Sequence, residues 1–300
     1  MKHWETTDPE WGRILHLSDG KTEVSAALDF GIRVVGLSAA GEPNLFYRQP
    51  EDDQEYRTPK GWRLYGGHRL WLSPESMPET YYPDNFAVPY TTEGNTVILT
   101  PKEQEGNHVQ YVFKVTLEEK GTKVTVAHTI YNRDSKEKTF APWGLSVLAP
   151  GGVEIVPQAD KQTGLLSNRI LALWDYSDMS DPRLWWGNKY ITLIQIPGMD
   201  KNFKLGLNHE KQWTSYLLGK ELFVKRYHTV DGGNYPDGGC SFETYICKNF
   251  LEMESLEELK TLAPGESVDH VENWELSVVE GGFDPKDEAS VDGFAKKYIW

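Results

Sequence analysis

Residues 109–115 read VQYVFKV and residues 123–130 read KVTVAHTI, and apolar and polar side chains alternate along both stretches. Alternation with a period of two is typical of a β-strand with one buried face. Residues 118–121, EEKG, join the two stretches and have the composition of a turn. Together the three segments predict a β-hairpin.

Strand-like segments separated by turn residues recur on both sides of this hairpin along the chain. Only short helices are predicted, at residues 286–297 and 78–84, and Gly and Pro are spread evenly, so no linker separates two halves. We therefore expect one all-β domain over residues 1–300, a large sandwich of mostly antiparallel strands. Further strands are predicted at 12–17, 23–28, 31–36, 95–100, 189–196, 203–207, 213–217, 221–227, 240–246, 250–254 and 273–279.

The charge of the chain narrows the choice of ligands. The formal net charge is -14, and no cluster of Lys and Arg stands out. A nucleic-acid surface requires such a cluster, and an anionic membrane surface does too, so neither partner is expected. A neutral small molecule or a cation fits this balance better. The chain has 11 Trp and 15 Tyr, whose faces can pack on sugar rings or fill a large core. The sequence leaves the oligomeric state open.

Short segments of the sequence bear on the compartment of the protein and on whether it binds a cofactor. The first 15 residues, MKHWETTDPEWGRIL, contain acidic residues and no apolar core, unlike a signal peptide. No run of 18 apolar residues is present to span a membrane. Cys240 and Cys247 are the only cysteines, and we expect them to be reduced in a cytoplasmic protein. Because zinc-ligand spacings and nucleotide-binding or hydrolase motifs are absent, no metal and no cofactor is predicted.

The first candidate site is the segment GGHRLW, residues 66–71. Two glycines allow a tight turn or a close approach to a ligand. Histidine, here His68, is the residue type that ordinarily titrates near neutrality, Arg69 offers fixed donors for hydroxyl oxygens, and Trp71 offers a stacking face. The alternative is a turn with a packed histidine and an ion-paired arginine.

The second candidate is FLEME, residues 250–254. On a strand, Glu252 and Glu254 share one face and stand roughly 6.5–7 Å apart. In a pocket, each carboxylate would raise the proton affinity of the other, which suits a general base. The same pair would also suit a hard cation. The alternative is a solvated strand face.

The third candidate is the turn and strand at residues 235–243, YPDGGCSFE. Pro-Asp-Gly is a strong turn. A plain turn followed by a strand explains the segment adequately, and the more specific interpretation places Asp237 or Glu243 at the rim of the same pocket.

These motifs, taken in order, resemble an uncharacterised bacterial family related to the aldose 1-epimerases, or galactose mutarotases. The resemblance covers about residues 30–280 and implies a β-supersandwich with a sugar pocket on one face of a large sheet. It is carried by GGHRLW with a following SPE, then DPR, YPDGGCSFE, FLEMESL, LAPGES and ENW.

The resemblance also implies residue roles. Arg69 would bind the sugar, and Glu252 or Glu254 would be the general base. The family places a catalytic His after the central hairpin, but the corresponding residues 140–146, FAPWGLS, contain none. His68 is then the substitute acid. Trp143 in this segment joins the sugar-binding candidates Arg69, Trp71, Tyr235, Asp237 and Glu243.

Three functions follow as hypotheses. The first is a sugar 1-epimerase with a late-strand glutamate as base. The second is a non-catalytic carbohydrate-binding or sensing protein on the same scaffold, and the third is a cation-dependent enzyme acting on an acidic saccharide. Fold alone does not choose among them.

Overall fold

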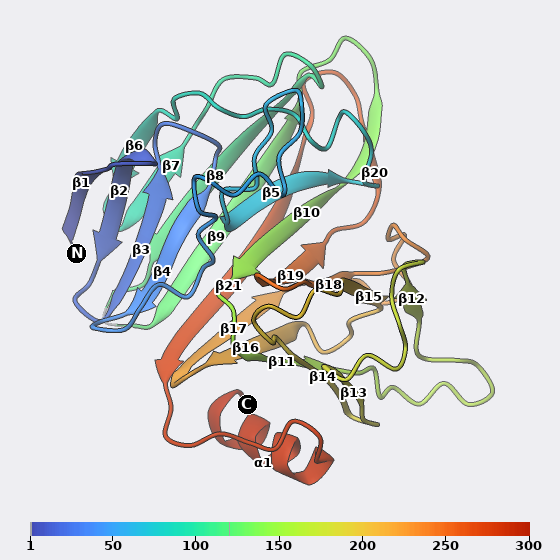
Figure 1. Ribbon diagram of the computed structural model, residues 1–300. Coiled ribbons are helices and arrows are strands. Elements are labelled where there is room, and N and C mark those ends of the chain that lie inside the picture. Colours follow the sequence, from blue (N-terminus) through green and yellow to red (C-terminus); the bar gives the residue numbers. More distant parts are fainter. Residues whose placement is uncertain (1, 120) are drawn as a thin grey trace.

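The computed structural model describes residues 2–119 and 121–300 as two large sheets and one helix (Figure 1). Neighbouring strands pair antiparallel throughout. The all-β expectation is confirmed. Lys120, which belongs to the predicted turn of the hairpin, lies outside the described residues.

The first sheet has 11 strands and carries the candidate site. In spatial order its strands are β1 (Lys2–Asp8), β2 (Gly12–Ser18), β3 (Thr22–Ala27), β4 (Val34–Ala39), β5 (Gly67–Ser73), β10 (Lys138–Leu148), β19 (Leu251–Leu256), β18 (Phe242–Ile246), β15 (Phe203–Leu207) and β12 (Leu171–Leu173), with β20 (Lys260–Leu262) paired to β10.

The second sheet has 10 strands and contains the hairpin that predicts the fold. In spatial order its strands are β13 (Leu184–Trp186), β14 (Tyr190–Ile194), β11 (Val153–Pro157), β16 (Trp213–Leu218), β17 (Glu221–Tyr227), β21 (Ser267–Val278), β9 (Lys123–Asn132), β8 (Val109–Leu117), β7 (Thr96–Leu99) and β6 (Tyr90–Glu93).

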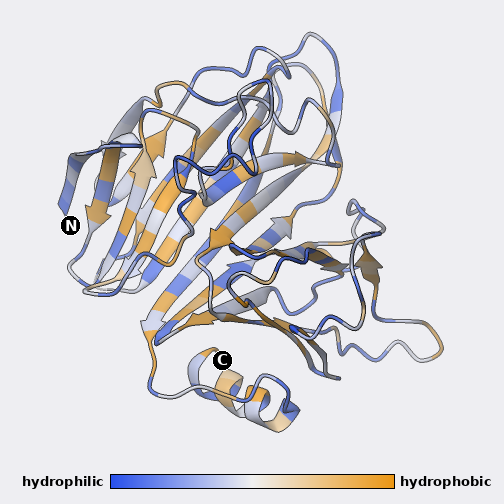
Figure 2. Cartoon of the chain, viewed as in Figure 1, coloured by the Kyte–Doolittle hydropathy of each residue, from blue (hydrophilic) through white to orange (hydrophobic). Residues whose placement is uncertain are grey.

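The core lies between the two sheets. Along the strands, apolar bands alternate with polar ones, as expected for strands with one face in the core (Figure 2). In β8, Val109, Tyr111 and Phe113 are buried, whereas the side chains between them are half-buried or exposed. The hairpin therefore follows the period of two that the sequence predicts.

The only helix in the described residues is α1 (Glu288–Tyr298), close to the prediction at 286–297. Asp287 caps it by accepting a hydrogen bond from the Ala289 N–H. Its buried face, Val291, Phe294 and Ala295, packs with apolar residues of the second sheet, below that sheet in Figure 1. The helix predicted at 78–84 is wrong, because residues 78–81 form turns and residues 82–84 have no regular structure.

Candidate functional site

Two glycines set the start of β5, the strand that begins the site. Gly66 and Gly67 have φ of 105° and 73°, the left-handed region that favours glycine. A Cβ on Gly66 would lie 2.0 Å from the Tyr47 carbonyl oxygen, and one on Gly67 would lie 2.5 Å from that of Val34. The glycines thus let β5 pass close to neighbouring backbone, as their pairing in the sequence suggests.

The strand period then divides the side chains of β5 between two faces. Leu70 and Leu72 belong to the core between the sheets, and Trp71 belongs to a separate apolar cluster on the other side. Arg69 therefore shares the face of Trp71, whereas His68 shares the face of Leu70. We call the face of the first sheet that carries Arg69 and Trp71 the outer face.

Register brings the other candidates onto this outer face. Arg69 lies opposite Leu145 of β10, and Leu145 lies opposite Glu254 of β19. Glu254 lies opposite Glu243 of β18. One step along, Glu252 is opposite Tyr245, and Tyr245 is opposite Lys204 of β15. Five adjacent strands thus present a single polar row.

A cavity of about 330 Å³ lies over this row, and we call it the pocket. Its size is typical of the lower range of small-molecule sites. Its charged lining comprises Arg57, Arg69, Glu75, Lys204, Glu252 and Glu254. Its aromatic lining comprises Tyr56, Trp62, Trp71, Tyr81, Trp143, Tyr176, Tyr245 and Phe250.

Of the two glutamates of β19, Glu252 is the one that solvent reaches. Its Oε1 accepts a hydrogen bond from Arg69 Nη1 at 3.0 Å, and its side chain is 9% exposed. The Arg69 guanidinium stacks 4.2 Å from the centre of the Trp71 ring. Because Trp71 and Glu252 fix Arg69 on two sides, a ligand would meet an oriented carboxylate and an oriented cation together.

Glu254 has a different environment from Glu252, so the structure distinguishes two glutamates that the sequence alone does not. It is fully buried, and its Oε2 accepts hydrogen bonds from Trp143 Nε1 and Lys204 Nζ, both at 2.9 Å. Lys204 Nζ also lies 2.8 Å from Oε2 of Glu243, which is 1% exposed. Glu254 therefore holds Lys204 and Trp143 in place.

The pocket and its edge contain more buried carboxylates than cations. Glu243, Glu252 and Glu254 face Arg69 and Lys204. Burial raises the pKa of Glu243 and Glu254, and it does so more strongly than Lys204 lowers them. Burial lowers the pKa of Lys204, but the attraction of Glu254 and Glu243 outweighs burial and raises it overall. The attraction of both carboxyl groups thus holds the Lys204 ammonium between them.

His68 does not reach the pocket, which corrects the sequence interpretation. It is fully buried between the sheets, where its ring lies 2.9 Å from Ser146 Oγ and 2.8 Å from His128 Nε2. Burial lowers its pKa well below the usual value. The physical reason is the strand period, because residues 68 and 69 must face opposite sides of β5.

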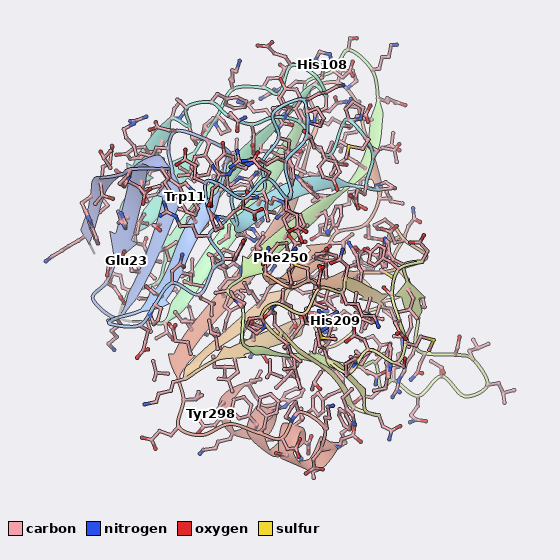
Figure 3. All side chains as sticks on the ribbon, viewed as in Figure 1. Trp11, Glu23, His108, His209, Phe250 and Tyr298 are labelled. Carbon is pink, nitrogen blue, oxygen red and sulfur yellow. The ribbon has the colours of Figure 1, made fainter. Side chains whose placement is uncertain are left out.

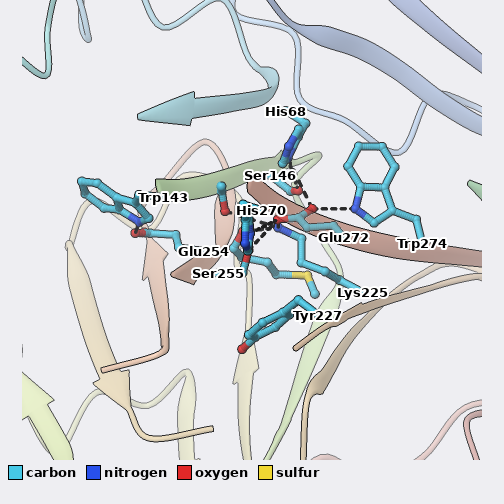
Figure 4. A network of polar contacts seen from close by, with 12 residues as sticks. His68, Trp143, Ser146, Lys225, Tyr227, Glu254, Ser255, His270, Glu272 and Trp274 are labelled. Carbon is cyan, nitrogen blue, oxygen red and sulfur yellow. Dashed lines mark hydrogen bonds and ion pairs between the residues drawn. The ribbon is translucent and has the colours of Figure 1, made fainter. Parts of the chain in front are cut away.

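His68 belongs instead to a polar network that joins the two sheets (Figure 4). Its centre is Glu272, which accepts hydrogen bonds from Lys225 Nζ at 3.0 Å, Ser255 Oγ and Trp274 Nε1. Lys225 is the largest influence that lowers the pKa of Glu272, which lies well below its usual value despite complete burial. The paired charges explain how these groups tolerate the core.

The third candidate segment is divided between two other cavities. Asp237 and Glu243 line a cavity of about 380 Å³ next to the pocket. Tyr235 lines a separate cavity of about 410 Å³, together with His209. Figure 3 shows His209 apart from Phe250 of the pocket. Tyr235, one of the sugar-binding candidates, thus lies outside the pocket, where its hydroxyl accepts a hydrogen bond from the Val230 N–H.

Lys204 is the residue that the sequence interpretation missed. It lies in FKLGL, residues 203–207, where Phe203, Leu205 and Leu207 supply the core face. A lysine facing away from the core on a fully buried strand has to be paired. The sequence alone does not show this conflict, because a lysine that alternates with apolar residues is also typical of a solvated strand face.

No three His, Cys, Asp or Glu side chains are grouped to hold a metal ion within residues 2–119 and 121–300. Arg69 and Lys204 instead contact the two carboxylates that the cation hypothesis requires. Cys240 and Cys247 are free and buried. Across the described residues, no helix has the length and apolar character to cross a membrane.

Comparisons with known proteins give matches of structure and none of sequence. No family model matches the chain, and no curated protein matches it. A TPR-domain containing protein from Parabacteroides distasonis matches with a TM-score of 0.62 and 14% identity, over 90% of this chain and 48% of that one. The chain thus spans about half of that protein.

Two further structures match over most of both chains. A putative aldose 1-epimerase from Klebsiella pneumoniae has a TM-score of 0.60 and 12% identity, with 95% of this chain and 82% of that one covered. A putative aldose 1-epimerase from Escherichia coli K12 has a TM-score of 0.55 and 12% identity, with 88% of this chain and 98% of that one covered. The fold is galactose mutarotase-like. At these identities the likeness concerns the galactose mutarotase-like scaffold, and any activity has to be argued from the pocket itself.

Proposed function

We propose that the pocket binds a sugar and accelerates the exchange of its anomers. The observation that carries this proposal is the Glu252–Arg69 pair, a partly exposed carboxylate held at 3.0 Å from an oriented guanidinium between aromatic side chains. Aromatic faces suit the C–H faces of a sugar ring, and the charged groups suit its hydroxyls. The galactose mutarotase-like scaffold supports the same proposal.

The proposed reaction needs a base and an acid on one sugar. Glu252 takes the proton from the anomeric hydroxyl as the bond between the anomeric carbon and the ring oxygen breaks. Arg69 orients that hydroxyl. Lys204 donates a proton to the ring oxygen, which becomes a hydroxyl of the open chain. When the open chain closes again on the other face, both protons return to where they began.

Lys204 takes the role that the sequence analysis gave to His68. Its ammonium lies in the same cavity as Glu252, whereas His68 has no exposed surface. The proposal therefore needs no histidine after the central hairpin. Glu254 is a positioning residue here, because it contacts Lys204 and Trp143 and has no exposed surface of its own.

Anomer exchange can be measured directly by NMR exchange spectroscopy on a panel of neutral aldoses. The Glu252→Gln variant is expected to lose about 10²–10⁴-fold in rate, because the base is removed while the side chain keeps its shape. Glu275→Gln is a matched control, since Glu275 forms a comparable 2.9 Å pair with Arg226 on the second sheet. Equal rates for Glu252→Gln and the unmodified protein would overturn the assignment.

A second candidate function is sugar binding without catalysis. The observation that favours it is that Glu252 is already paired with Arg69 at 3.0 Å, so one of its carboxylate oxygens is occupied before a sugar binds. Titration calorimetry would then show sugar binding while exchange spectroscopy shows no acceleration. In that case Glu252→Gln would change affinity only. The third hypothesis, an enzyme that depends on a metal cation, gains no support, because Arg69 and Lys204 already pair with Glu252 and Glu254.

A further inference from the structure

The pocket has a neighbour on the same outer face. The cavity of about 380 Å³ shares Glu75, Met77, Tyr81, Trp143 and Lys204 with the pocket. We call this second space the side cavity. The two spaces meet along this shared wall, so one ligand can extend from one into the other. The residues that line the side cavity but not the pocket are Pro74, Ser76, Trp174, Asp237 and Glu243.

The side cavity resembles the pocket in combining an aromatic ring with charged side chains. Trp174 provides an aromatic ring, and Lys204 Nζ lies 4.7 Å from its centre and 4.6 Å from that of Trp143. One ammonium thus stands between the aromatic side chains of the two spaces. The arrangement parallels Arg69 on Trp71, where a cation also lies against an indole beside a carboxylate. An aromatic face beside charged donors and acceptors suits a sugar ring.

Glu243 supplies an unused acceptor in this cavity. It is 1% exposed, and its Oε1 has no hydrogen-bond partner among the described residues. A buried carboxylate oxygen without a donor is costly. A sugar hydroxyl entering the side cavity would provide that donor. The same hydroxyl would compensate part of the burial that raises the pKa of Glu243.

Asp237 adds a second acceptor held by unusual backbone. Its φ is 50°, in the left-handed region, within a turn that continues through Gly238 and Gly239. Non-glycine residues in this region mark a turn or a functional site. Asp237, Glu243 and Glu75 outnumber Lys204 in charge, so the cavity disfavours a phosphate or carboxylate group on its occupant.

We infer that the side cavity is a second sugar subsite, and that the ligand of this protein is a neutral saccharide of at least two units. One ring occupies the pocket against Glu252 and Arg69, and the next occupies the side cavity against Trp174, Glu243 and Asp237. The inference rests on the proposed function, because it takes the pocket as the place of the first ring.

The test compares neutral monosaccharides with the disaccharides built from them, by titration calorimetry on the full chain. Glucose and galactose are compared with maltose, cellobiose and lactose, and glucuronate and glucose 6-phosphate probe the charge preference. A matching disaccharide should bind about tenfold tighter than its own monosaccharide, because it adds an aromatic contact and hydrogen bonds.

Two variants separate the subsites. Trp174→Ala removes the aromatic face, and Asp237→Asn removes a charge with a residue that tolerates the same backbone. Both should bring disaccharide affinity down to the monosaccharide level and leave monosaccharide affinity unchanged. Trp4→Ala is the control, because Trp4 is 38% exposed on β1. Thermal unfolding of each variant confirms that it is folded.

The outcomes distinguish this inference from the proposed function. If monosaccharides bind and disaccharides gain nothing, the second subsite is refuted while the proposed function stands. If the charged sugars bind more tightly than the neutral ones, the neutral class is refuted. If no sugar binds at all, both the subsite and the proposed function fail.

Discussion

At the scale of single residues, one position along a strand decides what a side chain can do. His68 and Arg69 are neighbours in the sequence, yet His68 bonds with His128 in the core and Arg69 pairs with Glu252 in the pocket. This difference follows from strand geometry, because successive side chains of a strand point to opposite faces. This rule could not be applied to His68 from sequence because GGHRLW was interpreted as a turn, and turns have no faces.

Replacing His68 should therefore affect stability and leave the pocket intact. His68→Asn leaves His128 and Ser146 without their partner in the core, and we expect the free energy of unfolding to fall by about 2–4 kcal/mol. Sugar affinity and anomer exchange should stay unchanged while the protein is folded. Urea unfolding and titration calorimetry measure the two effects.

His108→Asn is the matched control for this change. The His108 side chain is 48% exposed, and its φ of 52° is one that asparagine tolerates. It should leave stability within about 0.5 kcal/mol of the original. Loss of anomer exchange in folded His68→Asn would return His68 to the reaction.

At the scale of elements, the sequence predicts short strand-like segments between turns, whether one face is solvated, as in β8, or both are buried, as in β19. The hairpin of β8 and β9 alternates clearly, and β19 is found within two residues. In contrast, nine of the 11 residues of β10 are buried, and Pro142 and Gly144 interrupt its pattern. Pro and Gly are rare inside central strands, so the sequence does not predict the strand at the centre of the site.

The same elements explain how much of the site could be predicted. Glu252 and Glu254 were placed on one face by spacing alone, and the register then brings them beside Arg69. Which strands pair across long stretches of the chain cannot be inferred from the residues within each strand. The contact of Lys204 with Glu254 therefore appears only once β15, β18 and β19 are placed side by side.

A buried carboxyl behind the pocket gives a prediction at this scale. Glu154 of β11 is fully buried and accepts a hydrogen bond from Thr244 Oγ1 of β18 at 2.8 Å. Burial raises its pKa from 4.5 to about 8. The folded state thus holds a proton that the unfolded chain releases above its lower pKa. The stabilisation is complete below pH 4.5 and is lost as pH rises toward 8.

The Glu154→Gln variant should remove this dependence, because an amide does not ionise. Between pH 4.5 and 8, the unmodified protein should lose up to about 5 kcal/mol of unfolding free energy relative to the variant. Urea unfolding of both proteins across this pH range measures the difference. Parallel curves would show that Glu154 is ionised in the folded protein.

At the scale of the whole molecule, the chain crosses repeatedly between the two sheets. β10 belongs to the first sheet, β11 to the second, β12 to the first and β13 to the second. Residues of both sheets form one apolar cluster, including Leu70, Leu205, Val126 and Phe223. Neither sheet can bury its inner face without the other.

This interleaving predicts one cooperative unfolding transition, as expected for a single domain over residues 1–300. Far-ultraviolet circular dichroism reports on strands, and tryptophan fluorescence reports on packing near Trp274 in the core and Trp143 in the pocket. The two curves should coincide, with equal calorimetric and van't Hoff enthalpies. Two separate transitions would instead divide the chain into two domains.

The pairing of Arg69 with Glu252 joins residues 183 positions apart in the chain. During synthesis, β5 leaves the ribosome long before β19, the strand that supplies its partner. Until then Arg69 has no counter-charge, and the edge of β10 that β19 will occupy is open. The pocket therefore cannot form until β19 has emerged and paired with β10, so its formation follows the synthesis of the intervening strands.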